Sequence, residues 1–406
     1  MAHRVPLLRG GHELQLLEGS GEFFPSLIGA IAAARTEVLL ETYIFDFTGA
    51  GAEIAYALEN AARRGVSVQV VVDGVGTHAP EHWVHRMQQA GVQWRVYSPP
   101  GRLGLLVLQQ WRRLHRKLCV VDGRVGFCGG INVLDDYHDP NHGALEAPRF
   151  DFSLRVTGPL VAQMHATMSQ VWLRMQAASR LRQAQLTGAL VSLRAAQREA
   201  AAGAAEPLSC GLPRARAALV LRDNLLHRAS IEKSYLRAIG RARHEIIIAN
   251  AYFAPGRRMR HALVRAARRG VKVCLLLQGR YEYFMQYYAA RPVLGVLLRA
   301  GVQIHEYSPS FLHAKVAVID GMWATVGSSN LDPLSLLLAR EANVVVEDVF
   351  FAARLRTRLV HAMEHEGVRV DAAEYENRPR LQRAKEWLAF ALMRVALAVQ
   401  GKRTYL

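Results

Sequence analysis

The sequence LHRKLCVVD at residues 114–122, which the chain repeats as LHAKVAVID at residues 312–320, decides the fold. Both copies read His-x-Lys-x-x-x-x-Asp within an apolar run, and in both the Asp is followed directly by Gly. A second apolar run comes next, and then a turn that starts with Gly and ends with Asn, at Asn132 and Asn330. The spacing from the Asp to the Gly of this turn is the same in both copies. Two copies that agree in this way indicate a duplicated functional unit.

Alternation along a β-strand fixes the geometry of each copy. Residues i and i+2 of a strand share a face, so the His and Lys of each copy point the same way. Asp-Gly between two apolar runs is a strong hairpin signal, and the second strands are expected at 125–128 and 323–326. The candidate catalytic residues are His115, Lys117, Asp122, His313, Lys315 and Asp320. The two Asp residues are either catalytic or formers of the hairpin turn, and the sequence leaves both roles open.

The residue types point to phosphate chemistry. Neutral imidazole attacks phosphorus or moves a proton, an ammonium group holds a phosphate oxygen, and a side-chain amide donates a hydrogen bond to another. A glycine turn also lets backbone N–H groups approach an anion. We therefore expect a phosphate-handling site in which Asn132, Ser328 and Asn330 bind the substrate.

The duplication extends far beyond the motif. Residues 30–45 line up with residues 238–253 without a gap, and each half reads as alternating helices and strands that end in the hairpin. Continuous apolar strands at 68–72 and 273–277 predict a sheet that helices cover on both faces. The fold class is α/β, with two homologous halves that are each a mixed sheet flanked by helices. The expected segments are a first half at 1–175, a helical linker at 176–216, a second half at 217–370 and a basic amphipathic tail at 371–406.

Neither half carries a complete site, because each has only one motif histidine. A nucleophile and a general acid face each other across one phosphate only if the halves dock with their motifs together. We therefore expect packing about a pseudo-two-fold axis, with the active site at the interface between the halves.

The paired motifs, each with its Gly-x-x-Asn, resemble the phospholipase D superfamily over most of the chain. The stretches LETYIF at 40–45, IANAYF at 248–253 and TVGSSNLDPLS at 325–335 are similar to the bacterial cardiolipin synthases of the B type. The resemblance implies an enzyme that makes cardiolipin from phosphatidylglycerol through a covalent phosphohistidine. It implies no metal and no cofactor, because lysines and amides hold the charge.

The resemblance also implies roles for the site residues. One motif histidine attacks phosphorus and the other protonates the departing alcohol, and analogy with the family favours His115 as the nucleophile. A carboxylate on the far nitrogen of an imidazole fixes its tautomer. Glu341 stands where the family has such an acid, and Asp151 is its first-half counterpart. The alternative for these two acids is a surface salt bridge to Arg340 or Arg149.

A formal net charge of +17 attracts polyanions, which include nucleic acid and anionic membranes. A nuclease is the less favoured alternative, because nucleases of the superfamily are typically single halves that dimerise, so we expect no nucleic-acid partner. A hydrolytic phospholipase D and a phosphatidylserine synthase are the closer alternatives. The oligomeric state is not predicted.

Two apolar segments favour a phospholipid substrate at an anionic membrane surface. The first is an insertion with residues 103–108 beside Trp111, Arg112 and Arg113, and the second is the tail helix around residues 387–399. Apolar residues flanked by Trp and Arg suit the membrane interface, and the tail is too short to span a bilayer. Packing on the enzyme body is the alternative for both. No signal peptide is apparent, so we expect a peripheral enzyme on the cytoplasmic face of the bacterial cell membrane.

Overall fold

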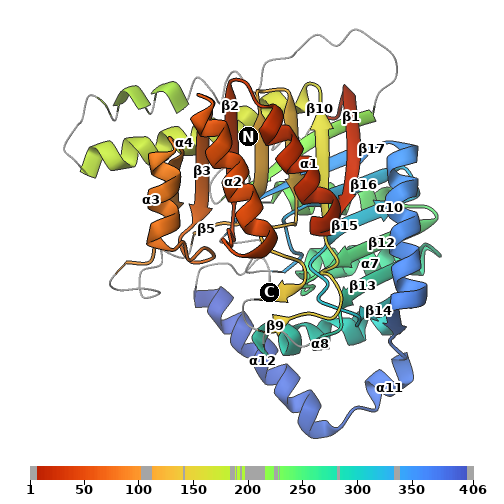
Figure 1. Cartoon of the computed structure of the whole chain (residues 1–406). Coiled ribbons are helices and arrows are strands. Elements are labelled where there is room, and N and C mark those ends of the chain that lie inside the picture. The colour runs from red at the N-terminus through yellow and green to blue at the C-terminus, as the bar shows by residue number, and fades with distance from the viewer. Residues whose placement is uncertain are drawn as a thin grey trace.

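The computed structural model shows two halves, each built from a β-sheet and helices, with a long C-terminal helix along one edge of the molecule (Figure 1). The structure describes residues 7–101, 112–139, 142–182, 188, 190–192, 194–196, 215–223, 227, 229–280, 284–332 and 339–399. The apolar insertion at 103–108 and most of the expected linker lie outside these residues.

The first half contains the helices and strands that its sequence predicts in the predicted order, together with further strands before, between and after them. Its elements are β1 (Arg9–Glu18), α1 (Gly19–Ala33), β2 (Glu37–Thr42), α2 (Gly49–Arg63), β3 (Ser67–Asp73), α3 (Glu81–Gln89), β4 (Gln93–Tyr97), β5 (Arg113–Leu114), β6 (Lys117–Val121), β7 (Val125–Gly129), β8 (His138–Asp139), β9 (Gly143–Ala144), β10 (Phe152–Thr157) and α4 (Leu160–Arg182). The expected hairpin is the pair β6–β7, and the apolar run at 68–72 is β3.

The second half repeats this order. Its elements are β11 (Ala215–Arg222), α6 (Ser230–Arg241), β12 (Glu245–Asn250), α7 (Arg257–Arg268), β13 (Lys272–Gln278), α8 (Phe284–Arg299), β14 (Gln303–Tyr307), β15 (Lys315–Ile319), β16 (Trp323–Gly327), β17 (Ala339–Glu347), α10 (Val349–His361), the π-helix η3 (Ala362–Glu366), β18 (Gly367–Arg369), α11 (Ala372–Glu376) and α12 (Arg380–Val399). The second hairpin is β15–β16, which confirms the prediction from the Asp-Gly turn.

The strands of both halves join in one mixed sheet with the order β18-β14-β13-β12-β15-β16-β17-β11-β1-β10-β7-β6-β2-β3-β4. Strands linked by crossover helices, β2-β3-β4 and β12-β13-β14, are parallel, and the hairpin strands beside them are antiparallel. The halves meet where β1 pairs with β11. The α/β class with a mixed sheet in each half is therefore confirmed.

Three apolar clusters explain how the layers hold together. One lies between the first-half sheet and α1 and α2, and a second lies between the second-half sheet and α6 and α7. The third is shared, because it combines strands of both halves with α4 and α10. Burial of this shared apolar surface favours docking of the halves, since removal of apolar area from water stabilises the contact.

Two of the expected segment boundaries fall inside regular elements, and the third, after residue 370, lies between β18 and α11. Helix α4 runs through the boundary at 175, and β11 begins before residue 217. No Gly or Pro occurs near residue 175, so the sequence gives no signal for a helix end there. The tail does form a helix, α12, which packs along α8 (Figure 1). Among the described residues, no helix has the length and apolar character needed to cross a membrane.

Candidate active site

Each motif histidine is tied to the other half of the chain. His115 precedes β6 and its backbone N–H donates to the carbonyl of Arg340 at 3.1 Å. His313 precedes β15 and its backbone N–H donates to the carbonyl of Phe150 at 2.9 Å. Each of these two contacts is the equivalent of the other under a pseudo-two-fold rotation that swaps the halves. The motifs therefore come together at the interface between the halves.

The side chains follow the same rule, because each motif histidine contacts a carboxylate from the other half. Glu341, on β17 of the second half, lies 3.0 Å from Nδ1 of His115. Asp151, just before β10 of the first half, lies 2.6 Å from Nδ1 of His313. Both carboxylates are buried, with exposed fractions of 0% and 2%, so neither forms the surface salt bridge considered from the sequence. With Nδ1 held in this way, Nε2 of each imidazole is left for chemistry.

Small residues make room for these carboxylates. A Cβ atom at Gly130 would lie 2.3 Å from Oδ1 of Asp151, so any larger residue there displaces the acid. Ser328, which the sequence predicts to bind substrate, lies beside Glu341. Its hydroxyl donates to Oε2 of Glu341 at 2.5 Å and is fully buried. This contact gives Ser328 a role in holding Glu341, and its substrate-binding role stays a prediction.

The motif lysines lie beside the histidines and are also buried. Nζ of Lys117 donates to the carbonyl of His115 at 2.7 Å, and Nζ of Lys315 donates to the carbonyl of His313. Burial lowers the pKa of Lys117 to about 7, with Glu341 opposing and Lys315 adding to the decrease. Two ammonium groups held this close in a buried site favour a bound anion between them.

The two histidine–carboxylate pairs differ in their electrostatics. Burial lowers the pKa of His115, against the attraction of Glu341. Burial would raise the pKa of Glu341, but His115 and Lys117 lower it overall. Burial and the two motif lysines lower the pKa of His313 well below its usual value, while burial raises the pKa of Asp151 to about 7 against the attraction of Lys315. The Glu341 pair is thus an ionised acid with a neutral imidazole, and the Asp151 pair gains an extra proton as the pH falls through about 7.

The motif asparagines lie in the turns after the hairpins and are nearly buried. Oδ1 of Asn132 accepts from the backbone N–H of Ile44 at 3.2 Å, so the side-chain amide is held in place. Oδ1 of Asn330 is buried and has no hydrogen-bond partner within the described part of the chain. A buried polar atom of this kind is costly unless it is satisfied. Because Oδ1 is an acceptor, a hydroxyl group or water satisfies it, whereas a phosphoryl oxygen is held only by the NH₂ of the same amide.

One aromatic residue at the site was not identified from the sequence. The ring of Tyr43 lies 4.8 Å from the ring of His115, and Nζ of Lys117 lies 5.5 Å from the centre of the Tyr43 ring. Tyr43 follows β2, and its position in the second half is occupied by Ala251. A comparison of the two copies identifies only residues that occur in both. Tyr43 occurs in one copy, so the comparison could not mark it as a site residue.

The motif aspartates do not face the histidines. Asp122 is five residues along the strand from Lys117, which is about 17 Å at the rise of a β-strand. Its carboxylate accepts from the backbone N–H groups of Arg35, Thr36 and Glu37 at 2.8–3.0 Å. Burial would raise the pKa of Asp122, but these donors lower it to about 2. Of the two roles left open by the sequence, the structure supports the structural one.

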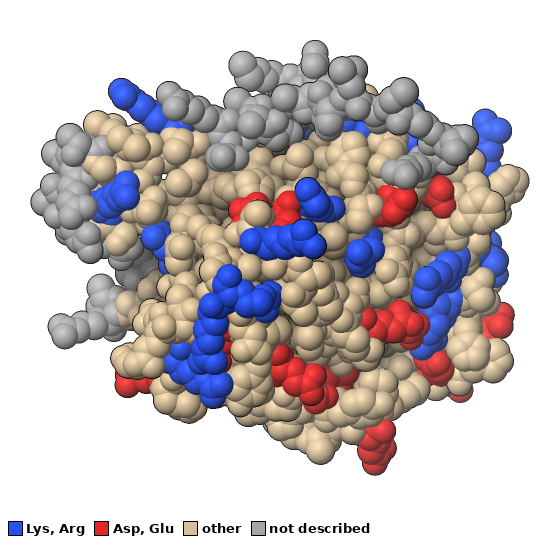
Figure 2. Space-filling view, turned by 45° about the horizontal axis from the view of Figure 1, so that its top comes forward, with Lys and Arg blue, Asp and Glu red and all other residues tan. Residues whose placement is uncertain are grey.

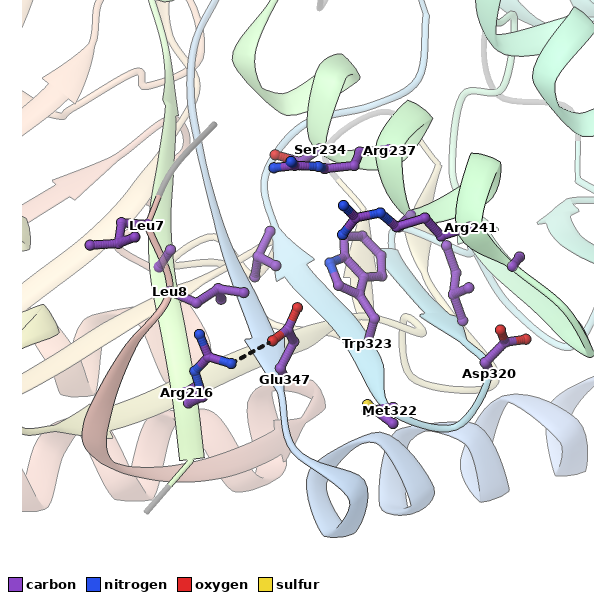
Figure 3. Close-up of a pocket in the computed structure, with 15 residues that line it drawn as sticks. Leu7, Leu8, Arg216, Ser234, Arg237, Arg241, Asp320, Met322, Trp323 and Glu347 are labelled. Carbon is purple, nitrogen blue, oxygen red and sulfur yellow. Dashed lines mark hydrogen bonds and ion pairs between the residues drawn. The ribbon is translucent and has the colours of Figure 1, made fainter. Parts of the chain in front are cut away.

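Asp320 occupies the matching place in the second half, at the end of its hairpin remote from His313. Its carboxylate accepts from the backbone N–H groups of residues 243–245 at 2.8–2.9 Å. Figure 3 shows Asp320 at the edge of a pocket of about 540 Å³, with Arg237, Arg241 and Trp323 on its walls. The pocket contains no motif histidine or lysine, so it is separate from the candidate active site.

Comparisons with known proteins identify the family of this chain. Residues 27–146 and 235–363 match a family described as "Cardiolipin synthase, PLD-like domain". The chain is 38% identical over 394 residues to cardiolipin synthase B of Salmonella typhi, which covers 97% of this chain and 90% of that protein. It is 37% identical over 404 residues to cardiolipin synthase B of Escherichia coli K12, with coverage of 97% and 90%. The crystal structure of a phosphatidylserine synthase from Haemophilus influenzae Rd KW20 has a TM-score of 0.68 over 99% of this chain and 97% of that chain, at 13% identity.

The duplicated fold and the paired histidines define a phospholipase D-like enzyme, a phosphatidyltransferase in the class of reaction that it catalyses. Within that superfamily the chain belongs to the cardiolipin synthase family. The likeness to the phosphatidylserine synthase shows the shared fold alone, because only 13% of the residues are identical.

Proposed function

We propose that the enzyme makes cardiolipin from two molecules of phosphatidylglycerol through a phosphohistidine intermediate. The observation that carries this proposal is that each half supplies the carboxylate for the histidine of the other half, which gives one chain two histidine–carboxylate pairs in one site. Double displacement at phosphorus needs one neutral imidazole as nucleophile and one proton donor for the leaving alcohol.

In the first step, Nε2 of His115 attacks the phosphorus of the donor lipid. The bond from phosphorus to the glycerol oxygen breaks, and that oxygen takes the proton held by the pair of His313 and Asp151. His115 suits the role of nucleophile because its partner Glu341 is ionised and its own pKa is lowered. Lys117 and Lys315 stabilise the charge on the phosphoryl oxygens in the transition state.

In the second step, a hydroxyl of the acceptor lipid gives its proton to the pair of His313 and Asp151. Its oxygen bonds to phosphorus as the bond from phosphorus to His115 breaks, which restores the free enzyme. Asn132 and Asn330 are proposed to hold phosphoryl oxygens through their side-chain amides, since each lies in the turn that follows its hairpin.

We also propose that the enzyme binds the surface of an anionic membrane, on its cytoplasmic face, through α12. One side of α12 packs on α8, with Ala389 buried. Leu381, Trp387, Leu388 and Leu392 are each more than half exposed, and Leu381, Leu388 and Leu392 recur at helical spacing. An apolar face with Trp beside basic residues suits the headgroup region. Figure 2 shows Lys and Arg on one face of the molecule in separate groups among Asp and Glu, so on that face no single basic patch explains membrane binding.

Product analysis tests the reaction. Purified enzyme is incubated with phosphatidylglycerol in vesicles, and the products are identified by mass spectrometry. Cardiolipin together with free glycerol is the expected result. Phosphatidic acid alone would instead indicate a hydrolase, and a requirement for a nucleotide-activated lipid with serine would indicate a phosphatidylserine synthase.

Peptide mapping tests the intermediate. Enzyme quenched during turnover should carry a phosphatidyl or phosphoryl adduct on the peptide that contains His115. The His115→Ala variant serves as the matched control and should carry none. An adduct on the peptide of His313 in the wild-type enzyme would reverse the proposed roles of the two histidines.

A further inference from the structure

A second pocket lies next to the first-half motif, between β4, α4 and the start of β17. Its volume is about 850 Å³. Its lining includes Arg95, Arg174 and Arg340 and, among the described residues, no carboxylate. Val171 and Met175 of α4 form part of an apolar wall. Positive charge and apolar surface therefore meet in one cavity.

Within the part of the chain that the structure describes, the three arginines form no ion pair with a carboxylate, and the charge of Asp223 offsets that of Arg174 only in part. Nε of Arg340 donates to the hydroxyl of Tyr97 at 3.0 Å. The guanidinium of Arg95 lies over the ring of Trp172 at 4.1 Å and donates to a backbone carbonyl. Arg174 forms no ion pair with a described carboxylate. Burial lowers the pKa of Arg174 and the charge of Arg340 lowers it further, which reflects mutual repulsion.

The pocket is joined directly to the catalytic residues. Arg340 is the neighbour of Glu341, which holds His115, and the carbonyl of Arg340 accepts from the backbone N–H of His115. Strand β5, which leads into His115, pairs with β17 at Arg340. Arg113 of β5 also donates to Ser98, a lining residue of the pocket. The pocket residue Arg340 is thus hydrogen-bonded to the backbone of His115, and the pocket residue Ser98 is hydrogen-bonded to Arg113, which lies two residues before His115.

The matching place in the second half is built differently, as its described residues show. Phe150 is the counterpart of Arg340, because its carbonyl accepts from His313 as that of Arg340 accepts from His115. Its ring stacks on Tyr307, with 5.1 Å between ring centres. Arg358 lies over Phe150 but pairs with Glu18 at 2.7 Å and with Glu366 at 3.1 Å. Among the described residues, stacked aromatic rings fill the side next to His313, and the arginine there is paired with acids. The side next to His115 contains a pocket lined by three arginines.

We propose that this pocket binds the phosphate of the acceptor lipid, so that the enzyme selects an alcohol that carries its own phosphate. The inference rests on the proposed function, in which a second phospholipid attacks the phosphohistidine. The acceptor phosphate is separated from the attacking hydroxyl by a short glycerol bridge, so it must lie beside the catalytic centre. Unpaired guanidinium groups are suited to hold it by charge-assisted hydrogen bonds. Water and serine carry no phosphate and would have no use for such a pocket.

Two reactions of the same enzyme separate acceptor binding from the rest of catalysis. Cardiolipin formation from phosphatidylglycerol uses a lipid acceptor, and exchange of labelled free glycerol into phosphatidylglycerol uses an acceptor without phosphate. Both reactions start from the same donor. We expect Arg174→Gln, and independently Arg95→Gln, to lower the ratio of cardiolipin formation to glycerol exchange by about tenfold, the loss of one charge-assisted hydrogen bond. Arg174→Lys should recover part of the ratio.

Arg241→Gln, in the separate pocket of Figure 3, removes the same charge and should leave the ratio unchanged. An unchanged ratio in the Arg174 and Arg95 variants would overturn the proposal, whether both reactions persist or both decline together. A common decline would assign the pocket to the donor lipid. A wild-type enzyme that exchanges glycerol but forms no cardiolipin would contradict the proposed function itself, which is a different result.

Discussion

The Asp122→Asn substitution separates a structural role of the motif aspartate from a catalytic one. Asparagine has a similar shape and tolerates the left-handed backbone of this position, where φ is 50°. It keeps Oδ1, which accepts from the backbone N–H groups of Thr36 and Glu37. It replaces Oδ2 by an amide that faces the N–H of Arg35, so two donors meet and the negative charge is lost.

The structure gives the size of the effect. The pKa of Asp122 is lowered from 3.8 to about 2. This difference corresponds to about 2 kcal/mol. Because the carboxylate is partly exposed and screened by solvent, we expect Asp122→Asn to lower the free energy of unfolding by about 1–2 kcal/mol at pH 7. The pKa is depressed in the folded state, so this contribution is present above about pH 4 and is lost as the pH falls towards about 2. The difference between the variant and the wild-type enzyme should narrow over that range.

Urea unfolding followed by circular dichroism measures the stability, and cardiolipin formation per folded enzyme measures the activity. We expect the activity of the variant to stay within a few-fold of the wild-type value, because Asp122 is remote from His115. His115→Ala is the control for the activity assay, and it should lose activity. If Asp122→Asn kept full stability but lost activity by about a hundredfold or more, the structural reasoning would be wrong.

Replacement of either motif histidine by alanine should abolish turnover in the cardiolipin assay, because double displacement needs both imidazoles; near-normal activity in either variant would contradict the shared site. Lys117→Ala and Lys315→Ala should each lower kcat by about a hundredfold, since a buried donor to the transition-state charge contributes roughly 3 kcal/mol. The rate should decline as the pH rises through about 7, where Lys117 and the pair that contains Asp151 lose protons, and a pH–rate profile that rises through this range would exclude these roles. Leu388→Asp combined with Leu392→Asp should reduce co-sedimentation with anionic vesicles and leave circular dichroism unchanged; wild-type binding should weaken as salt rises, and unchanged sedimentation of the variant would remove α12 from the membrane contact.

Local patterns in the sequence were sufficient to predict the two hairpins and to predict on which face of the strand each motif side chain lies. The positions of β6, β7, β15 and β16 follow from apolar runs and Asp-Gly turns, and these depend only on neighbouring residues. The duplication also revealed the α/β class, because matching helices and strands appear in both halves. The strands that join the halves, β1 and β11, were not anticipated, because a pairing between distant strands leaves no local pattern.

The sequence by itself determined which residues carry the chemistry, since the His and Lys of each motif share a strand face whatever the rest of the fold does. Only the tertiary structure decided how they are paired. The contact between His115 and Glu341 spans 226 residues, and that between His313 and Asp151 spans 162 residues. No local pattern encodes such contacts, because they arise where the two halves pack together around the β1–β11 pairing. The same packing places three arginines of the first and second halves beside His115, in the pocket between β4, α4 and β17.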